Sequence, residues 1–186
     1  MMQELSMNVL DIAENSVAAG AKLICITLAA DTAQKRLTLT IADDGCGMSA
    51  DTLARVTDPF CTGRKTRKVG LGLPFLKMAA EMTDGTFAIE SALGVGTTVT
   101  ATFTLGHIDL APIGALGETI AALLQCNPDI DFTFIVRADK AEFCADTREL
   151  REILGGVSFA EPEVAVWLRE YLEEHSNEIL KRSIVL

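Results

Sequence analysis

The stretch Ile41–Ser49, IADDGCGMS, ends an apolar run with two aspartates and two glycines. The residues before it, LTLTI at 37–41, alternate and are rich in branched side chains, which predicts a strand. Asp-Gly pairs are typical of turns, because Asp caps its own backbone and Gly accepts a positive φ. Taken alone, the stretch predicts a tight turn after a strand. The rest of the chain decides whether the two carboxylates also have a chemical role.

Upstream of this stretch, the sequence predicts a helix over residues 3–19 and strands over about 22–30 and 36–42. One face of the helix is apolar and includes Ser16. A second face carries a polar stripe at spacings of four, three and four, made of Glu4, Asn8, Asp11 and Asn15. Gly20 is placed to end the helix.

Downstream, Ser49 is predicted to cap a short helix over 50–57, and residues 58–69 lack any period and are interpreted as a loop. A helix with Pro74 in its first turn runs to about Met82. The segments TFAIES and TTVTATFTL then predict an antiparallel pair joined by ALGVG.

A second unit of the sequence begins at Gly106-His107. A helix is expected at 114–125, a hairpin from DFTFIVRA and AEFCA, a helix over 148–154 capped by Asp146 or Thr147, and an acidic amphipathic helix opened by Pro162. We therefore predict two domains, residues 1–105 and a small acidic α+β unit at 106–186, here called the C-terminal segment.

Composition limits the class of protein. The 186 residues are 49% hydrophobic and 23% charged, which is ordinary for a globular chain. The apolar stretches are too short to span a membrane, the start carries no basic leader, and the five scattered cysteines form no C-x-x-C pair. We expect a cytoplasmic protein with reduced thiols and no membrane partner.

The net charge of −10 is uneven. Residues 1–105 hold 9 Lys/Arg and 11 Asp/Glu, whereas residues 106–186 hold 7 and 15. A chain this acidic is a poor candidate for broad nucleic-acid binding. Four cations nevertheless gather in GRKTRK, at Arg64, Lys65, Arg67 and Lys68, and this local cationic loop indicates a small anionic ligand.

Four pieces follow one another along the chain: a helix with a polar Asp/Asn stripe, a strand ending in D-x-G-x-G, a cationic loop running into Gly70-Leu71-Gly72-Leu73 at a helix start, and GVGTT before a last strand. Each is weak alone. Free amides and the helix dipole at the glycine pair could bind a phosphate, or the pair could form a tight turn. The ordered set is far more specific than any member.

In this order the pieces resemble the GHKL superfamily, which comprises gyrase, heat-shock chaperone ATPases, histidine kinases and MutL-type mismatch-repair ATPases. The resemblance covers roughly residues 3–105. The segments that carry it are NVLDIAENSVAAGAK (N box, closest to the mismatch-repair form), DDGCGM (G1 box), DPFCTGRKT (F box and short lid), GLGLPFLKMAAEMTDGTFAIES (G2 box) and GVGTTVTATF (G3 box).

The resemblance implies a two-layer α/β sandwich of the Bergerat type. Its mixed, mostly antiparallel sheet would be covered on one face by helices, with a small α+β appendage after it. It also implies ATP and Mg²⁺ as cofactors, with ATP held between the helices and the lid.

Site roles follow from the same resemblance. Asp43 would accept a hydrogen bond from the adenine amine, with Thr97 supporting it, and the glycines beside it would let the base approach the backbone. Asn15 would bind Mg²⁺ through its amide oxygen.

The phosphates would meet amides of Gly70 and Gly72, and Lys65 with its neighbours would close over the γ-phosphate. Asp11 and Lys65 are the predicted catalytic residues. The predicted nucleotide-binding residues are Asn8, Asn15, Asp43, Gly45, Gly47, Met48, Phe60, Thr62, Arg64, Lys68, Gly70, Leu71, Gly72, Leu73 and Thr97.

The sequence departs from the family at two of these positions. Hydrolytic members carry a Glu one turn before the Asn, and here that residue is Asp11, one methylene shorter. Asp11 is expected to be either the general base, or a solvated helix residue, or a residue that contacts the ligands of Mg²⁺. Glu14 is a poorer base because it points about 100° away around the helix. Lys68 replaces the first glycine of the kinase G2 motif. The lid would therefore hold phosphates by side-chain charge where the family uses backbone amides.

A sensor kinase needs a phospho-acceptor histidine on an upstream helix, and this chain starts within the first helix of the ATP domain. His107 and His175 are interpreted as ordinary surface residues. A kinase of this kind would act in trans on a partner, as the stand-alone anti-sigma-factor kinases of the superfamily do. Cys61, beside the lid cations, is interpreted as filling a gap, with a redox-gated lid as the alternative.

Three functions stay open at this point. The first is Mg-ATP-dependent phosphoryl transfer to a partner or to water. The second is a nucleotide-gated interaction switch with little turnover, with a protein partner docking on residues 106–186. The third, a DNA-repair-type ATPase, is disfavoured by the charge of −10. A homodimer is left open.

Overall fold

The computed structural model describes residues 4–57 and 72–181. Its helices are α1 (Leu5–Ala18), α2 (Ala50–Leu53), α3 (Gly72–Glu81), α4 (Leu116–Cys126), α5 (Thr147–Ile153) and α6 (Pro162–Lys181). Its strands are β1 (Leu23–Asp31), β2 (Arg36–Asp43), β3 (Phe87–Ala92), β4 (Gly96–Thr104), β5 (Asp131–Ala138) and β6 (Ala141–Asp146). The elements follow the predicted order, and α2 is shorter than the helix expected at 50–57.

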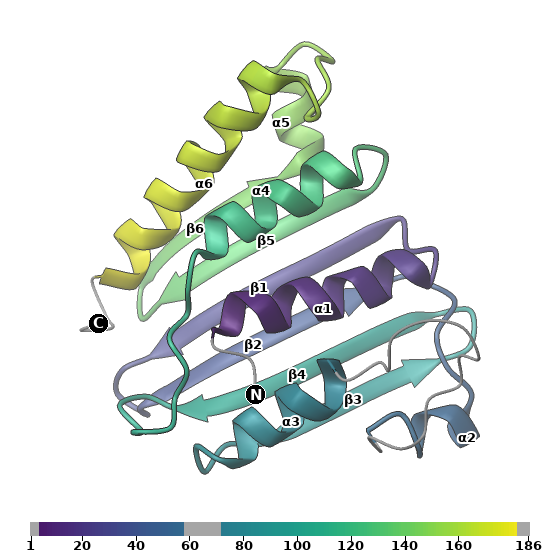
Figure 1. The fold of residues 1–186 in the computed structure, drawn as a ribbon, viewed down its shortest axis with the longest axis vertical. Coiled ribbons are helices and arrows are strands. Elements are labelled where there is room, and N and C mark those ends of the chain that lie inside the picture. The colour runs from purple at the N-terminus through teal and green to yellow at the C-terminus, as the bar shows by residue number, and fades with distance from the viewer. Residues whose placement is uncertain (1–3, 58–71, 182–186) are drawn as a thin grey trace.

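All six strands form one sheet with the order β3-β4-β2-β1-β5-β6 (Figure 1). Neighbouring strands are antiparallel except β1 and β5, which run parallel. The central register places Thr27 of β1 opposite Thr40 of β2 on one side and Ile135 of β5 on the other. The prediction of a mixed, mostly antiparallel sheet is confirmed.

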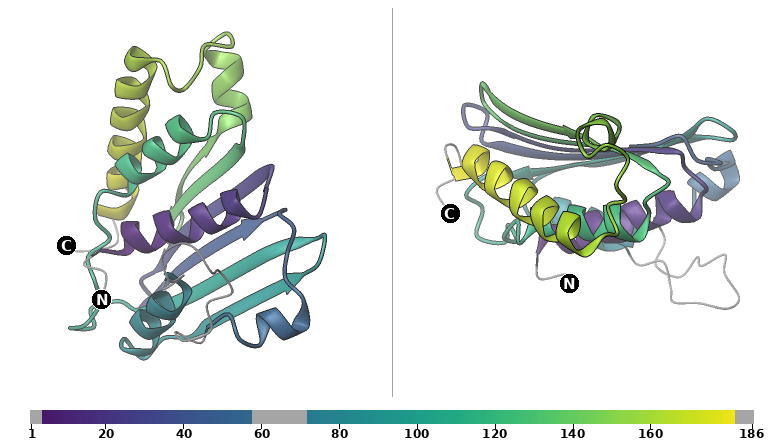
Figure 2. Two further views of the ribbon diagram at one scale, coloured as in Figure 1. Left: turned by 45° about the vertical axis from the view of Figure 1, so that its right-hand side comes forward. Right: turned by 90° about the horizontal axis from the view of Figure 1, so that it is seen from above.

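The sheet has one apolar and one polar face, because successive side chains of a strand point to opposite sides. On β1, Ile24, Ile26 and Leu28 are buried, while Cys25 and Thr27 between them are only half-buried. Helices α1, α3, α4 and α6 lie on the apolar face, as the view from above in Figure 2 shows. The fold is therefore the two-layer α/β sandwich that the sequence predicted.

The C-terminal segment continues this architecture. Strand β5 pairs with β1 along eight positions, from Leu23 opposite Asp131 to Ala30 opposite Ala138. The connection before α4 also pairs with the start of α1, where the Leu5 and Ser6 amides donate to the carbonyls of Pro112 and Ile113, both at 2.9 Å. One hydrophobic core runs through both parts. The division at residue 105 into two domains stays a prediction.

Within residues 4–57 and 72–181, no helix combines the length and the apolar character that crossing a bilayer requires.

Candidate functional site

Three segments meet where β2 ends. The loop after β2 is bound on one side by α1, because the Cys46 amide donates to the carbonyl of Ala19 at 2.9 Å. On the other side it is bound by the β3–β4 turn, where the Gly94 amide donates to the carbonyl of Cys46 at 2.8 Å. The Asp-Gly stretch is thus a turn, as its local chemistry predicts, but one held between a helix and a hairpin.

The Asp43 side chain is held by two donors. The hydroxyl of Ser16, on α1, donates to Oδ2 over 2.6 Å, and the Gly45 amide donates to Oδ1 over 3.0 Å. Ser16 is 3% exposed, whereas Asp43 is half-buried. The carboxylate is therefore fixed in direction, in a residue that is only half-buried. We call Ser16, Asp43, Gly45 and Gly47 the Asp43 cluster.

The two glycines of the cluster have steric reasons to be glycine. Gly47 has φ +63°, and a Cβ there would lie 1.9 Å from the carbonyl oxygen of Ala92. A Cβ on Gly45 would lie 2.8 Å from the Cβ of Ala19. The backbone of this loop is packed against its neighbours more closely than any side chain permits.

Asp44 has a different role from Asp43. Its Oδ1 accepts the amides of Lys22 at 2.6 Å and Leu23 at 2.9 Å, which ties the loop to the start of β1. The bond from Leu23 is the main reason that the pKa of Asp44 lies below its usual value. Asp44 therefore anchors the loop to β1, whereas Asp43 is bonded to Ser16 of α1.

Asp11 and the start of α3 lie against each other. A Cβ on Gly72 would be 3.0 Å from the Cβ and 3.4 Å from Oδ2 of Asp11, and Gly72 is buried. The start of α3 therefore lies next to the polar stripe of α1. Leu73, the next residue, packs against the hydrophobic core.

Exposure along the polar stripe rises toward the Asp43 cluster. Asn8 is 2% exposed, Asp11 is half-buried and Asn15 is exposed. Asn8 donates to the carbonyl of Glu4 over 3.5 Å, and its Oδ1 has no hydrogen-bond partner among the described residues. The structure thus places Asn8 beneath the surface, and its predicted contact with a nucleotide stays a prediction.

Thr97 stands opposite Asp43 in the β2–β4 pair, as its predicted supporting role requires. Its hydroxyl, however, bonds to Ser91 at 2.9 Å, and no hydrogen bond joins it to the Asp43 carboxylate within the described part of the chain. Ser91 also accepts the Met48 amide at 2.8 Å. Thr97 and Ser91 therefore hold the loop at Met48 rather than the carboxylate.

Several predicted site residues lie outside the described residues. They include all the predicted lid residues and the first part of the G2 motif: Phe60, Cys61, Thr62, Arg64, Lys65, Lys68, Gly70 and Leu71.

Sequence reasoning did not single out Ser16 and Ser91 as site residues. Ser16 is predicted to lie on the apolar face of its helix. Its hydroxyl, within an otherwise apolar stripe, is the one sequence signal that could have marked it as a site residue. Ser91 is predicted to end the strand TFAIES, within the segment that resembles the G2 box.

The polar side chains of this region are of the kinds that binding of Mg-ATP would require. A fixed carboxylate suits a base that presents an amine, because an ionised carboxylate accepts hydrogen bonds. Asn15, which is exposed, and Asp11 carry oxygen ligands of the kind that a hard cation prefers.

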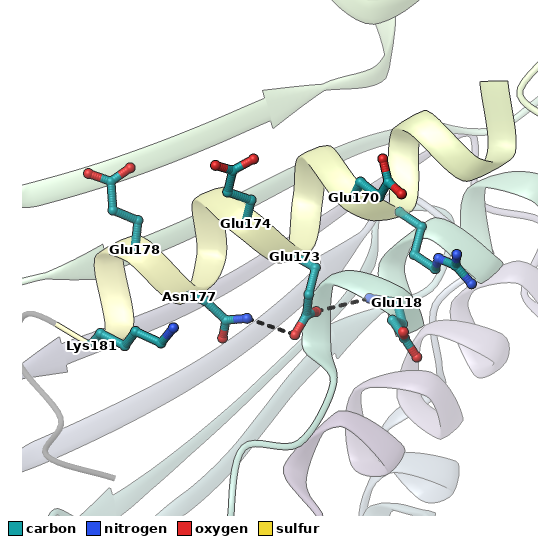
Figure 3. A pocket seen from close by; sticks show the side chains of 8 residues that line it. Glu118, Glu170, Glu173, Glu174, Asn177, Glu178 and Lys181 are labelled. Atoms are coloured by element: carbon teal, nitrogen blue, oxygen red, sulfur yellow. Dashed lines mark hydrogen bonds between the residues drawn. The ribbon is translucent and has the colours of Figure 1, made fainter. Parts of the chain in front are cut away.

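A separate groove of about 890 Å³ opens between α4 and α6. Figure 3 shows it lined mainly by acidic side chains of α6, with Glu173 accepting the Glu118 amide at 3.3 Å and the Asn177 amide group at 2.9 Å. It shares no residue with the Asp43 cluster.

Comparisons with known proteins bear on the same region. A family model described as "Histidine kinase-, DNA gyrase B-, and HSP90-like ATPase" matches residues 1–107. A heme sensor protein of Staphylococcus saprophyticus is 43% identical over 68 residues, which are 36% of this chain and 15% of that protein. A putative sensor protein of Shewanella frigidimarina is 40% identical over 72 residues, which are 38% of this chain and 11% of that protein.

Among solved structures, the MutL ATPase domain of Aquifex aeolicus complexed with ADP superposes with a TM-score of 0.56 at 13% identity. The match covers 83% of this chain and 70% of that one, and it concerns the fold alone. The chain corresponds to only about a tenth to a sixth of the two sensor proteins.

Proposed function

Because the chain belongs to the family of histidine kinase-, DNA gyrase B- and HSP90-like ATPases, we propose that it binds Mg-ATP at the Asp43 cluster. We propose further that it uses ATP for phosphoryl transfer, to a partner protein in trans or to water. The observation that supports this most directly is the Asp43 carboxylate, which Ser16 and Gly45 fix at the end of β2 in a residue that is only half-buried.

Each residue would act on a different part of the nucleotide. Asp43 would accept the adenine amine, and Asn15 would hold Mg²⁺, which when bound neutralises phosphate charge and orients the γ-phosphate. Free amides at the start of α3 would meet the phosphates, next to Asp11. Lys65 is proposed to close the site from the lid.

Asp11 is the proposed general base for transfer to water. Its position beside Gly72 brings a carboxylate to the place where the phosphates would lie, and a positioned base accelerates such steps roughly 100- to 10,000-fold. Transfer to a protein side chain would use the same carboxylate on the acceptor hydroxyl or imidazole.

The two histidines of the chain both make contacts within the protein. His175 Nδ1 donates to the Tyr171 carbonyl at 2.8 Å, and its ring stacks on Phe143 at 5.0 Å between centroids. His107 lies 3.7 Å from carboxylate oxygens of Asp84 and Asp109. An acceptor on a partner therefore fits the proposal better than autophosphorylation.

The test follows the γ-phosphate of labelled ATP with Mg²⁺ and the full chain. We expect the label to leave ATP slowly, and Asp11→Asn to reduce the rate at least 100-fold while ATP still binds. Glu14→Gln, next to Asn15 but on another side of α1, is the matched control and should keep the rate.

A second function is favoured if bound ATP stays intact. The chain would then be a nucleotide-gated switch, or a kinase that needs its partner, and the C-terminal segment with its acidic α4–α6 groove is the proposed docking region. ATP that does not bind at all would contradict both functions.

A further inference from the structure

The Asp43 carboxylate takes its direction from helix α1 as much as from its own loop. The Ser16 hydroxyl has two acceptors within reach, Oδ2 of Asp43 at 2.6 Å and the carbonyl of Ile12 at 3.4 Å. A hydroxyl has one proton, and the shorter contact to a carboxylate is the stronger bond. The proton of Ser16 therefore belongs to Asp43.

This bond divides the acceptor capacity of Asp43 in a defined way. An ionised carboxylate offers about four lone-pair positions, two on each oxygen. Ser16 occupies one on Oδ2 and Gly45 one on Oδ1. What remains for a ligand is an acceptor pair whose orientation is fixed before the ligand arrives.

We infer that Ser16 is a positioning residue that sets the base selectivity of this site, by holding Asp43 as an acceptor for an exocyclic amine. The inference rests on the proposed nucleotide-binding function. Thr97, the residue expected from the family resemblance to support Asp43, is bonded to Ser91 instead. Ser16 is the side chain that supports the Asp43 carboxylate.

Burial makes the effect of Ser16 selective. At 3% exposure its hydroxyl is covered by protein and cannot serve as a ligand group itself. Removing it would free Oδ2 to turn, which weakens a directional bond to an amine but leaves contacts with sugar and phosphates in place. A purely structural serine would affect every nucleotide alike.

The experiment measures calorimetric affinity of the full chain for ADP and for inosine diphosphate, which carries a carbonyl in place of the adenine amine. The wild type should bind ADP at least tenfold more tightly. Ser16→Ala should weaken ADP about tenfold, as expected for a hydrogen bond to a charged group, and change the affinity for inosine diphosphate less than twofold.

Ser176→Ala is the matched control. Ser176 is also buried, at 1% exposure, and its hydroxyl bonds to the Leu172 carbonyl at 2.5 Å in α6. It should leave the preference for ADP unchanged. If Ser16→Ala does not fold, Ser16→Cys keeps the volume with a much weaker donor and should show the same selective loss.

The outcomes separate the inference from the function on which it rests. Equal losses for ADP and inosine diphosphate in the Ser16 variants would make Ser16 a structural residue and overturn the inference alone. A wild type that binds both diphosphates equally well would overturn base recognition by Asp43 and the inference together. A wild type that binds neither would overturn the proposed function as well.

Discussion

At the residue scale, Asp43 and Asp44 are neighbours in sequence and differ in what they hold. Asp44 accepts two backbone amides of the β1 start, which secures the loop. Asp43 accepts one side-chain hydroxyl and one amide and is half-buried. The two neighbouring carboxylates thus differ in role: Asp44 anchors the loop, and Asp43, held by Ser16 and Gly45, is the proposed recognition group.

The glycine at position 47 gives a residue-scale prediction. Gly47→Ala places a Cβ 1.9 Å from the Ala92 carbonyl oxygen at a φ of +63°, so the loop must move away from the β3–β4 turn. We expect a loss of about 2–3 kcal/mol in the free energy of unfolding, measured by urea denaturation.

Gly94→Ala separates the clash from the backbone strain. Gly94 has a similar φ of +73°, but a Cβ there meets nothing within 4 Å. Its substitution should cost about 1 kcal/mol. Equal losses for the two variants would show that the close approach at Gly47 contributes nothing.

At the element scale, α1 lies against three neighbours: the sheet, α3 and α4. One face, with Val9, Ile12 and Ser16, packs on the sheet. The polar stripe turns toward α3, where Asp11 contacts Gly72. Helix α4 lies along the other side, as Figure 1 shows. The same helix therefore positions the proposed catalytic carboxylate and orients the proposed adenine-binding one.

Helix α5 supplies an element-scale prediction about pH. Its N-cap Asp146 accepts the Arg148 amide at 2.9 Å and is paired with the Arg148 guanidinium. The guanidinium bond is the main reason that the pKa of Asp146 falls to about 2. Since the folded pKa lies below the unfolded one, the stabilisation is present above about pH 4 and is lost as pH falls toward 2.

Asp146→Asn keeps the cap and removes the charge. We expect the melting temperature of the variant to fall less steeply than that of the wild type between pH 4 and pH 2, with a loss of about 1 kcal/mol or less at neutral pH. Asp129→Asn, an exposed change nearby, is the control. Parallel curves for wild type and Asp146→Asn would contradict the assignment.

The caps of α2 and α5 could be predicted from the sequence, because the donor lies only two or three residues beyond the cap. The alternation of β1 and β2 and the stripe of α1 are equally local. The bond between Ser16 and Asp43 spans 27 positions and has no local signal. The parallel pairing of β1 with β5 depends on packing between segments about a hundred residues apart, which no periodicity specifies.

At the scale of the whole molecule, the acidic C-terminal segment shares the sheet and the core of the family domain. Phe132 and Phe134 of β5 are buried together with the helix-facing residues of β1. Without this segment, β1 would present an unpaired edge eight residues long. A destabilising substitution in one part of the molecule should therefore lower the stability of the other part as well.

The last prediction concerns this coupling. Trp167 is the single tryptophan of the chain, stacked on Tyr171 in α6 at 5.1 Å between centroids, so its fluorescence reports on the C-terminal segment. Leu39→Ala, at a buried position of β2, should cost about 2–5 kcal/mol. We expect the unfolding midpoint from Trp167 fluorescence to move with the midpoint from circular dichroism, because one cooperative core unfolds as a unit. Leu93→Ala, at a 69% exposed turn position, should move neither. A fluorescence midpoint that stays in place in Leu39→Ala would instead show that residues 106–186 fold as the separate domain that the sequence predicts.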